Sequence, residues 1–337
     1  MKKVSVIIPC FNATKYLPKC FMSLVQQTIG IDQIELIFVD DASTDEDATW
    51  NMLQEFERAY PESIMILKLE ENMRQGGARN VALQYATGEY IAFVDADDFV
   101  SENFLLETYE KAKESDADII QFEYFYYTDR LGAVDSGRNI TPEVIEISSV
   151  SDRKRFLISE KVTYGCWNKL YRHTLLNEAH TAYAEHVIYE EPLFVYPLLY
   201  FANKIVILND AYYYYRQNDS GTMRNDMRQE ETLKMHADVQ LAVWNFMKKT
   251  PFFKEYYDEI KLYFLHTYLY ETLYFAKLRD FKPSYSFYKE LEKTILAEVP
   301  DYAQSTYSAL IPKQMELYRM MGEGMTEMKF REYWERL

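Results

Sequence analysis

Apolar residues in the first 128 positions form short continuous runs, separated by stretches with helical spacing. The runs are rich in Val, Ile and Phe and are bounded by polar or turn residues, which predicts buried strands at 4–8, 34–39, 64–69, 90–94 and 118–127. Between them, apolar side chains recur every three or four residues, which predicts helices at 12–27, 43–60, 76–88 and after 101. Polar residues that can cap these helices stand at their starts: Asn12 or Thr14, Ser43 or Thr44, and Ser101.

This alternation of strand and helix is typical of an α/β fold with a doubly wound, mostly parallel sheet. Right-handed crossovers place helices on both faces of such a sheet, and ligands bind outside the carboxyl ends of its strands. Asp40 and Asp41 follow the second predicted strand, and the run Asp95–Asp98 follows the fourth. We therefore expect these two acidic segments to line one crevice, although about 55 residues separate them.

The pattern changes after residue 128. Residues 130–150 contain Gly132, Gly137 and Pro142 and are predicted to form a mobile loop, and residues 152–225 mix short helices with strands. From about residue 228 the chain has a helical, Tyr-rich pattern, and four prolines should divide it into several helices: Pro251, Pro283, Pro300 and Pro312. We therefore expect two domains, residues 1–225 and a helical C-terminal region, residues 226–337.

Composition narrows the classes of function. The 337-residue chain carries a formal net charge of −16, which argues against binding to nucleic acid or, through bulk charge, to anionic lipid. Its three cysteines, Cys10, Cys20 and Cys166, lack the spacing of a metal site and indicate a reducing compartment. No uninterrupted apolar stretch reaches about 18 residues, and the N-terminal apolar run is too short for a signal peptide. We therefore expect a cytoplasmic protein.

The strongest chemical signal is the segment Tyr90–Asp98, in which a strand-forming run ends in three carboxylates. Because an unpaired buried charge is costly, Asp95, Asp97 and Asp98 should lie at the mouth of the sheet and hold something positive. Mg²⁺ is held in this way by one or two carboxylates, with phosphate and water at its other positions. A solvated acidic loop is the alternative that these residues alone leave open.

Five motifs in order resemble family 2 of the inverting glycosyltransferases, which have the GT-A fold. They lie at the expected strand ends and are Val6–Asn12, Val39–Asp45, Gly77–Asn80, Gly88–Asp98 and Trp167–Tyr171. The resemblance is dense over residues 3–128, thinner to about residue 222, and absent from the C-terminal helices. It implies a GT-A-like catalytic domain over residues 1–225, with a donor half (1–128) and an acceptor half (129–225), followed by the helical region 226–337.

The resemblance also implies a nucleotide-sugar donor, usually a UDP-sugar, together with Mn²⁺ or Mg²⁺. Asp95-Ala96-Asp97 matches the DxD motif of the family. Asp97 is the expected ligand of the metal that bridges the diphosphate, and Asp95 would face the ribose or sugar and serve as the second metal ligand. Asp98 would either cap the following loop or join the metal site.

Residues that follow the first two strands would bind the nucleotide base. By the family pattern, Pro9 and Phe11 form the wall of a uracil pocket, with Asn12 beside them. Asp41 matches the position that accepts a hydrogen bond from the uracil N–H, and Asp40 is its alternative. Either aspartate could instead be a simple turn residue.

Three arginines and one tryptophan complete the expected binding site. Arg74 and Arg79 stand at a predicted helix start and suit a uracil carbonyl or a phosphate, although Arg79 could instead pair with a carboxylate. Arg216, in a segment through Ser220–Met223 that resembles a donor-covering loop, would approach the diphosphate. Trp167 lies in a segment that borders the acceptor site in this family and could stack on a sugar, although a core role is equally common.

Inversion at the anomeric carbon proceeds by direct displacement, so a carboxylate must take the proton of the acceptor hydroxyl. The family commonly uses the Asp of a Tyr-Glu-Asp run, and the matching run here is Tyr189-Glu190-Glu191. Glu191 is therefore the first candidate for the base and Glu190 the second. Two solvated glutamates at a helix start are the alternative, because the helix dipole favours carboxylates there.

These residues indicate a metal-dependent enzyme that moves one sugar from a UDP-sugar to a hydroxyl of a glycan or lipid-linked acceptor, in cell-surface polysaccharide biosynthesis. The alternative is a glycosyltransferase-like scaffold that has lost its base. A dehydrogenase or P-loop enzyme is excluded because no GxGxxG or GxxxxGK[ST] follows the first strand. The C-terminal helices should pack on the catalytic domain, and they could also form a homodimer or contact the inner face of the membrane.

Overall fold

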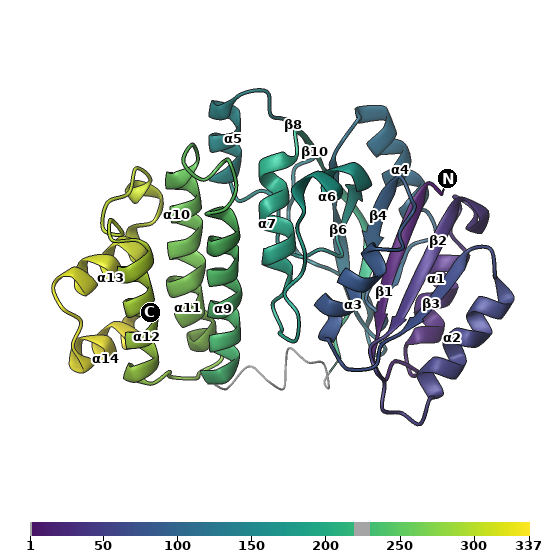
Figure 1. Ribbon diagram of the computed structural model, residues 1–337, viewed down its shortest axis with the longest axis horizontal. Coiled ribbons are helices and arrows are strands. Elements are labelled where there is room, and N and C mark those ends of the chain that lie inside the picture. The colour runs from purple at the N-terminus through teal and green to yellow at the C-terminus, as the bar shows by residue number, and fades with distance from the viewer. Residues whose placement is uncertain (1, 219–229) are drawn as a thin grey trace. The chain divides into compact units, whose positions relative to one another are not determined.

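The computed structural model describes residues 2–218 and 230–337, and the chain divides into two compact units, Met1–Asn218 and Asp219–Leu337 (Figure 1). The first unit is built around one mixed sheet, and the second is helical. Each unit has its own buried apolar core, as expected for separate folding units.

The sheet of the first unit has ten strands, eight of which follow the order β3-β2-β1-β4-β9-β6-β10-β5. The strands are β1 Val4–Cys10, β2 Ile34–Asp40, β3 Ile64–Lys68, β4 Tyr90–Phe93, β5 Phe99–Val100, β6 Ile119–Thr128, β7 Gly132–Asp135, β8 Glu143–Glu146, β9 Lys169–Arg172 and β10 Lys204–Arg216. Strands β3, β2, β1 and β4 are parallel to one another. Strand β9 is antiparallel to both β4 and β6, and β6 is parallel to β10. The predicted doubly wound α/β fold with a mostly parallel sheet is therefore confirmed.

Helices connect these strands and cover the sheet. They are α1 Leu17–Val25, the short 3₁₀ turn η1 Ile31–Gln33, α2 Ala48–Ala59, α3 Arg74–Leu83, α4 Phe104–Ser115, α5 Val150–Leu157, α6 His173–Ala179 and α7 Glu191–Phe201. The apolar side of α1 is buried with alternate residues of β1, such as Val6 and Ile8, and with Phe104 of α4. Because a central parallel strand is covered on both faces, β4 is apolar along its length and β1 is apolar except at Ser5.

The predicted helix caps are wrong. The N-cap residues of α1, α2 and α4 are Tyr16, Asp47 and Asn103, and none of them accepts a hydrogen bond through its side chain. The polar residues that were expected to cap these helices link loops instead, because Asn12 bonds Thr44 through both atoms of its side-chain amide. The helices therefore begin several residues later than the caps would place them.

The predicted mobile loop at 130–150 is also wrong, because this segment contains two short strands. Strand β7 pairs with β6, and β8 pairs with β10, both antiparallel. The glycines that suggested a loop take positive φ angles, +72° at Gly132 and +74° at Gly137, which a turn between strands requires.

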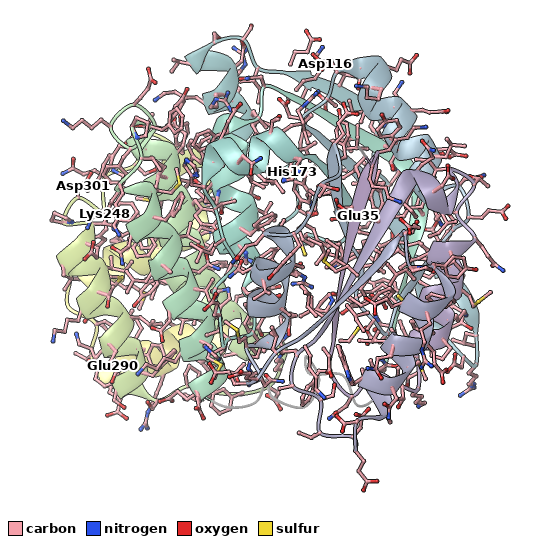
Figure 2. The ribbon with its side chains drawn as sticks, turned by 45° about the vertical axis from the view of Figure 1, so that its right-hand side comes forward. Glu35, Asp116, His173, Lys248, Glu290 and Asp301 are labelled. Atoms are coloured by element: carbon pink, nitrogen blue, oxygen red, sulfur yellow. The ribbon has the colours of Figure 1, made fainter. Side chains whose placement is uncertain are left out.

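Side chains at the edge where β1, β2 and β4 begin tie these strands together (Figure 2). Glu35 of β2 accepts hydrogen bonds from the backbone N–H of Thr87 and from the Ser5 hydroxyl of β1. His173, at the start of α6, lies with its Nδ1 2.9 Å from the carbonyl oxygen of Gly88, just before β4. This edge is held by polar contacts, which leaves the opposite, carboxyl edge of the same strands for binding.

The second unit consists of helices separated where prolines occur, as predicted. They are α9 Glu230–Met247, α10 Tyr257–Leu265, the π-helical turn η2 His266–Glu271, α11 Thr272–Leu278, α12 Tyr285–Glu298, the 3₁₀ turn η3 Ser308–Leu310, α13 Pro312–Gly322 and α14 Glu327–Arg336. Buried Trp244 donates a hydrogen bond to Glu298, which also pairs with Lys248, so α9 and α12 are joined at one end (Figure 2). No helix in the described part of the chain is both long and apolar enough to cross a membrane.

Candidate active site

The carboxyl ends of β1, β2 and β4 meet at one edge of the sheet, where the sequence placed its acidic crevice. Cys10 at the end of β1 is in register with Asp40 of β2, and the Asp41 N–H donates to the Cys10 carbonyl oxygen at 2.8 Å. Phe11 follows β1 with 47% of its side chain exposed, although large apolar residues are usually covered.

Asp41 is buried, and its contacts connect β2 to the start of α3. Its Oδ1 accepts the N–H of Met73 at 2.7 Å, and its carbonyl oxygen accepts a hydrogen bond from the Asn72 side chain. Burial raises the pKa of the Asp41 carboxyl, although the backbone N–H groups of Met73 and Arg74 oppose this. Asp40 differs, because its Oδ1 accepts the Ser43 N–H while its buried Oδ2 has no partner among the described residues.

Arg74 lies beside Asp41 with its backbone in the left-handed region, at φ +59°. This conformation is costly for a residue with a Cβ, and it is held by a hydrogen bond from the Arg74 N–H to Asn72 Oδ1. Its half-buried side chain makes no hydrogen bond or ion pair with the described residues. The guanidinium of Arg74 is therefore available to a ligand at this edge of the sheet.

Asn12 does not extend into the crevice as a free amide. It has φ +49°, and its side chain and backbone bond Thr44 and Ser43, in the loop after β2. Asn12 therefore holds the loops after β1 and β2 together.

Three carboxylates follow β4 and have different environments. Asp98 is buried, and both of its oxygens are satisfied, one by the Tyr213 hydroxyl at 2.7 Å and the other by the Arg216 N–H at 2.6 Å. The Asp98 carboxylate is therefore bound to β10 and does not cap the loop that follows it. Asp97 accepts a hydrogen bond from the Asn218 amide at 2.8 Å, and Asp95 accepts one from Arg79 at 2.6 Å.

The Asp97 carboxyl has an unfavourable environment for its negative charge. Burial and the neighbouring charge of Asp95 raise the pKa of Asp97 to about 6. A bound cation would relieve this repulsion. No group of three or more His, Cys, Asp or Glu side chains within residues 2–218 and 230–337 is arranged to hold a metal alone. One or two carboxylates, with a diphosphate and water supplying the remaining oxygens, fit Mg²⁺ or Mn²⁺.

Arg216 is buried, and its guanidinium is already engaged. It donates to the Asp97 carbonyl oxygen at 2.7 Å and to the Asp129 carboxylate at 2.6 Å, and it lies over the ring of Tyr16 at 4.6 Å. The side chain therefore holds the backbone of the acidic loop in place. The loop of Ser220–Met223, which was expected to cover the donor, lies outside the described residues.

Arg79 connects the acidic loop to the candidate bases. It is 2% exposed and donates to Asp95 from one guanidinium nitrogen and to Glu190 from another, both at 2.6 Å. Arg79 therefore pairs with carboxylates, which was the alternative to a ligand-binding role. Burial raises the pKa of Glu190 and Arg79 opposes this shift, so the ion pair keeps Glu190 engaged at the centre of the site.

Glu191 has a different position, at the first turn of α7. Its Oε1 accepts the backbone N–H of Cys166 at 2.7 Å, and the Cys166 thiol also contributes a hydrogen bond to this carboxyl. Burial raises the pKa of the Glu191 carboxyl, and the charge of Arg79 opposes the shift. Glu190 is therefore paired with the Arg79 guanidinium, whereas Glu191 makes no ion pair with a cation of the described residues.

Gly76 allows the segment that carries these glutamates to approach α3. A Cβ at Gly76 would lie 2.3 Å from the Ala184 carbonyl oxygen and 2.9 Å from Glu190 Cγ, both closer than real contacts allow. The missing side chain at Gly76 thus lets Arg79 reach Glu190 across the same helix face.

Trp167 lies in the sequence between the acidic run Asp95–Asp98 and the pair Glu190–Glu191. Its ring stacks on Tyr215 at 5.3 Å and contacts Tyr213 at 4.7 Å, and the Tyr213 hydroxyl bonds both Asp98 and the Asp95 N–H. Trp167 directly follows Cys166 in the chain, and the Cys166 N–H holds the Glu191 carboxylate. Tyr124 meets its ring edge-on at 4.8 Å, so Trp167 begins a row of aromatic rings.

Several contacts of this site were not predicted. The Cys166 N–H, the Tyr213 hydroxyl and the Asn218 amide each hold a carboxylate of the site. A backbone N–H carries no signal in the residue type, and one Tyr among 30 does not stand out. These partners depend on how β10 and the loop before β9 pass beside β4.

The fold and the acidic edge define a sugar-nucleotide type of α/β transferase, and comparison with known proteins names the family. The model of glycosyl transferase family 2 matches residues 5–179, so the chain belongs to this family and is a glycosyltransferase with the GT-A fold. A glycosyltransferase of Streptococcus pneumoniae, GlyG, is 31% identical over 240 residues, which are 66% of this chain and 73% of GlyG.

Two further relatives extend the comparison. The poly(ribitol-phosphate) beta-N-acetylglucosaminyltransferase TarS of Staphylococcus aureus is 30% identical over 66% of this chain, which matches only 36% of TarS. The structure of residues 1–349 of TarS in complex with UDP covers 98% of this chain and 89% of that chain, with a TM-score of 0.69 and 22% identity. A mannosyltransferase of Pyrobaculum calidifontis, in complex with GDP-Man and Mn²⁺, has a TM-score of 0.52 at 16% identity, covering 89% of this chain and 81% of that one. At these identities the two structures bear on the fold alone.

Proposed function

We propose that this glycosyltransferase transfers one sugar, with inversion, from a UDP-sugar to a hydroxyl of a glycan or glycoconjugate acceptor. The observation that carries the proposal is the arrangement of Asp97, Arg79 and Glu191. Asp97 would take the metal and the diphosphate. Arg79 joins Asp95 of the same acidic loop to Glu190, the neighbour of Glu191, while Glu191 itself accepts the Cys166 N–H. The names of relatives such as TarS agree with a cell-surface polymer as the acceptor.

In the proposed reaction, the acceptor oxygen forms a bond to the anomeric carbon of the donor. The bond from that carbon to the diphosphate oxygen breaks, and UDP leaves with the electron pair. Glu191 takes the hydroxyl proton on its carboxylate. A Mg²⁺ or Mn²⁺ ion held by Asp97 and Asp95 would neutralise the charge that develops on the leaving UDP.

In this proposal the uracil base and the diphosphate of the donor occupy different ends of the crevice. Phe11 and Pro9 would cover one face of the uracil, and Asp41 would accept its ring N–H. Arg74, whose side chain has no described partner, would meet a uracil carbonyl or a phosphate. Arg79 and Arg216 would act without touching the donor, because both are occupied in holding the acidic loop.

The acceptor would approach along the aromatic row that begins at Trp167. Tyr124 and Tyr126 continue this row, with ring centroids 5.4 Å apart, and Tyr126 is 38% exposed. Pyranose rings pack on aromatic faces, so this row suits a carbohydrate. The scaffold alternative is less favoured, because a lost base would not need a carboxylate oriented by Cys166.

The test is UDP release from a panel of UDP-sugars with Mn²⁺, with and without EDTA. We expect slow, metal-dependent hydrolysis of one donor, lost in Asp97→Ala and in Glu191→Gln. UDP binding without turnover of any donor, even when candidate acceptor glycans are added, would contradict an active transferase and favour the scaffold.

We also propose that the protein works in the cytoplasm, where UDP-sugars are made, and meets its acceptor at the inner face of the membrane. Homodimer formation through the helical unit is part of the same proposal. Co-sedimentation with lipid vesicles and the mass in solution test these two points, and a monomer that stays in the supernatant would contradict both.

A further inference from the structure

The loop 163–168 carries the N–H that orients Glu191, and it contains neither helix nor strand. Cys166 is fully buried and donates to Glu191 Oε1 at 2.7 Å. Because a hydrogen bond weakens steeply when its angle departs from linear, the position of Cys166 sets the direction of the Glu191 carboxylate. Whatever fixes this loop therefore bears on the candidate base.

Lys169, the first residue of β9, holds the loop in place through hydrogen bonds of its side chain. Its side chain is fully buried, and its Nζ donates to the Gly165 carbonyl oxygen at 2.5 Å, to Asn168 Oδ1 at 2.8 Å and to Thr163 Oγ1 at 3.0 Å. An ammonium has three donors, so all three are used. The acceptors come from residues on both sides of Cys166, and the ammonium therefore closes the loop around it.

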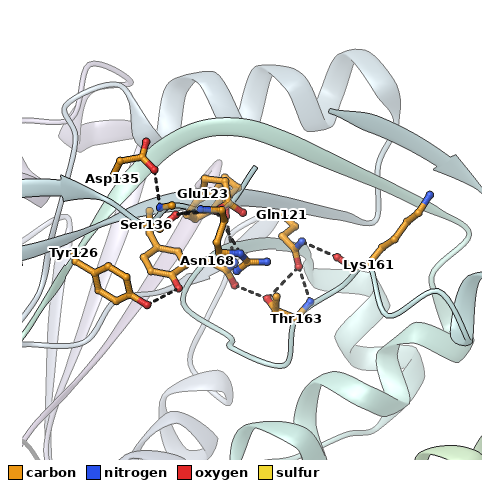
Figure 3. A network of polar contacts seen from close by, with 12 residues as sticks. Gln121, Glu123, Tyr126, Asp135, Ser136, Lys161, Thr163 and Asn168 are labelled. Atoms are coloured by element: carbon orange, nitrogen blue, oxygen red, sulfur yellow. Dashed lines mark hydrogen bonds and ion pairs between the residues drawn. The ribbon is translucent and has the colours of Figure 1, made fainter. Parts of the chain in front are cut away.

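A second layer of contacts anchors the same loop to β6 (Figure 3). Gln121 accepts the Thr163 N–H at 2.9 Å through its side-chain oxygen and donates to the Lys161 carbonyl oxygen at 3.1 Å. The Asn168 amide donates to the Phe122 carbonyl oxygen at 3.2 Å. The two ends of the loop are thus fixed to a central strand, while Lys169 sets the shape between them.

The charge of Lys169 is unusual for its surroundings. It makes no ion pair with a carboxylate of the described residues, although a buried ammonium without one carries a large desolvation cost. Burial lowers the pKa of Lys169 to about 7, and the negative charge of Glu191 is the strongest effect that opposes this. Burying a cation that bonds only loop oxygens costs more desolvation free energy than an apolar side chain would at the same position. This cost points to a specific role for Lys169.

We infer that Lys169 is a positioning residue for Glu191: its ammonium shapes the loop 163–168 so that the Cys166 N–H directs the carboxylate toward the acceptor. The inference rests on the proposed function in so far as Glu191 is the base. Lys169 itself touches neither donor nor acceptor.

The test uses Lys169→Met, which keeps the length of the side chain and removes its three donors. Lys161→Met is the matched control, because Lys161 lies just before the loop with an exposed side chain that pairs with Glu143 at 2.5 Å. For UDP release we expect kcat to fall about 10²-fold in Lys169→Met, as for other small displacements of reacting groups. The KM for the donor should stay within about twofold, since the residues proposed to bind the nucleotide lie outside this loop, and the control should match the wild type.

A second measurement does not depend on activity. All three cysteines are buried and free, so iodoacetamide should label none of them in the native wild-type protein. In Lys169→Met we expect Cys166 alone to react, with mass spectrometry locating the label, while Cys10 and Cys20 stay protected. Protection of these two cysteines shows that the sheet is still folded.

Lys169→Gln keeps two N–H donors on a shorter side chain and should show a smaller loss of kcat than Lys169→Met. If iodoacetamide labels all three cysteines of Lys169→Met, that variant is unfolded and Lys169→Gln replaces it in the test. The inference is overturned if the folded variants keep kcat within about twofold of the wild type, or if Cys166 remains protected. If the wild type releases no UDP from any donor, the proposed function fails, while the labelling of Cys166 still decides whether Lys169 holds the loop.

Discussion

Replacing Glu191 by Gln separates its role as proton acceptor from its role in packing. Gln keeps an oxygen that can accept the Cys166 N–H, but its amide nitrogen cannot take a proton. General bases contribute about 10²- to 10⁴-fold to rate. We therefore expect kcat for UDP release to fall by this factor, which corresponds to about 3 to 5 kcal/mol of barrier.

The neighbouring Glu190→Gln provides the comparison, because Glu190 has a structural partner. This change leaves the buried Arg79 with Asp95 as its one remaining carboxylate partner. Uncompensated buried charge is costly, so we expect the free energy of unfolding to fall by about 2 to 3 kcal/mol, and Tm by about 4 to 12 °C. Burial already opposes the charge of Glu191, so Glu191→Gln should change Tm by only about 2 °C.

The assay is initial-rate UDP release at saturating donor, paired with thermal unfolding of each variant. Glu185→Gln is the control, since Glu185 is an exposed glutamate in the same segment, and it should change neither rate nor Tm. If Glu191→Gln keeps about half of the activity or more while Glu190→Gln loses it at an unchanged Tm, the assignment of the base to Glu191 is refuted.

Three further predictions follow from single features. Asp97→Ala should lower UDP release about 10²-fold or more, and EDTA should do the same for the wild type, because the proposed ion would lose a ligand; unchanged rates would contradict the metal site. Gly76→Ala should destabilise the first unit by about 1 to 3 kcal/mol in urea unfolding, because its Cβ would overlap the Ala184 carbonyl oxygen. In the second unit, burial lowers the pKa of His236 to about 4. The unfolded chain therefore takes up this proton first as pH falls, and stability that is complete above about pH 6.5 should decrease by about 2 kcal/mol between pH 7 and 5. Urea unfolding of His236→Gln should show less of this decrease.

Arg79 connects the two acidic parts of the site. A single guanidinium bonds Asp95, beside the proposed diphosphate position, and Glu190, beside the proposed base. Two carboxylates that would repel each other are thus held on one cation, in surroundings with little water. A change at either end should be felt at the other, since buried charges couple more strongly than exposed ones.

Local patterns in the sequence determined much of the fold. Apolar runs such as Val4–Ile8 predicted the parallel strands, because a strand covered on both faces is mostly apolar and its few polar side chains need partners. Asp41 and Asp95 were expected to meet at one edge, because the carboxyl ends of parallel strands share it. The prolines of the second unit marked the ends of its helices, because proline cannot continue the hydrogen bonding of a helix.

The tertiary structure alone decided which polar groups are already occupied. Asp98 and Asp97 are adjacent, and only the path of β10 shows that Tyr213 and Arg216 satisfy the first and not the second. Likewise, Glu190 and Glu191 differ because Arg79 reaches one and the Cys166 N–H reaches the other. These partners lie far apart in the sequence, and a hydrogen bond depends on distance and angle that residue types do not encode. The sequence determined the kinds of groups at the site, and the packing of distant segments determined their roles.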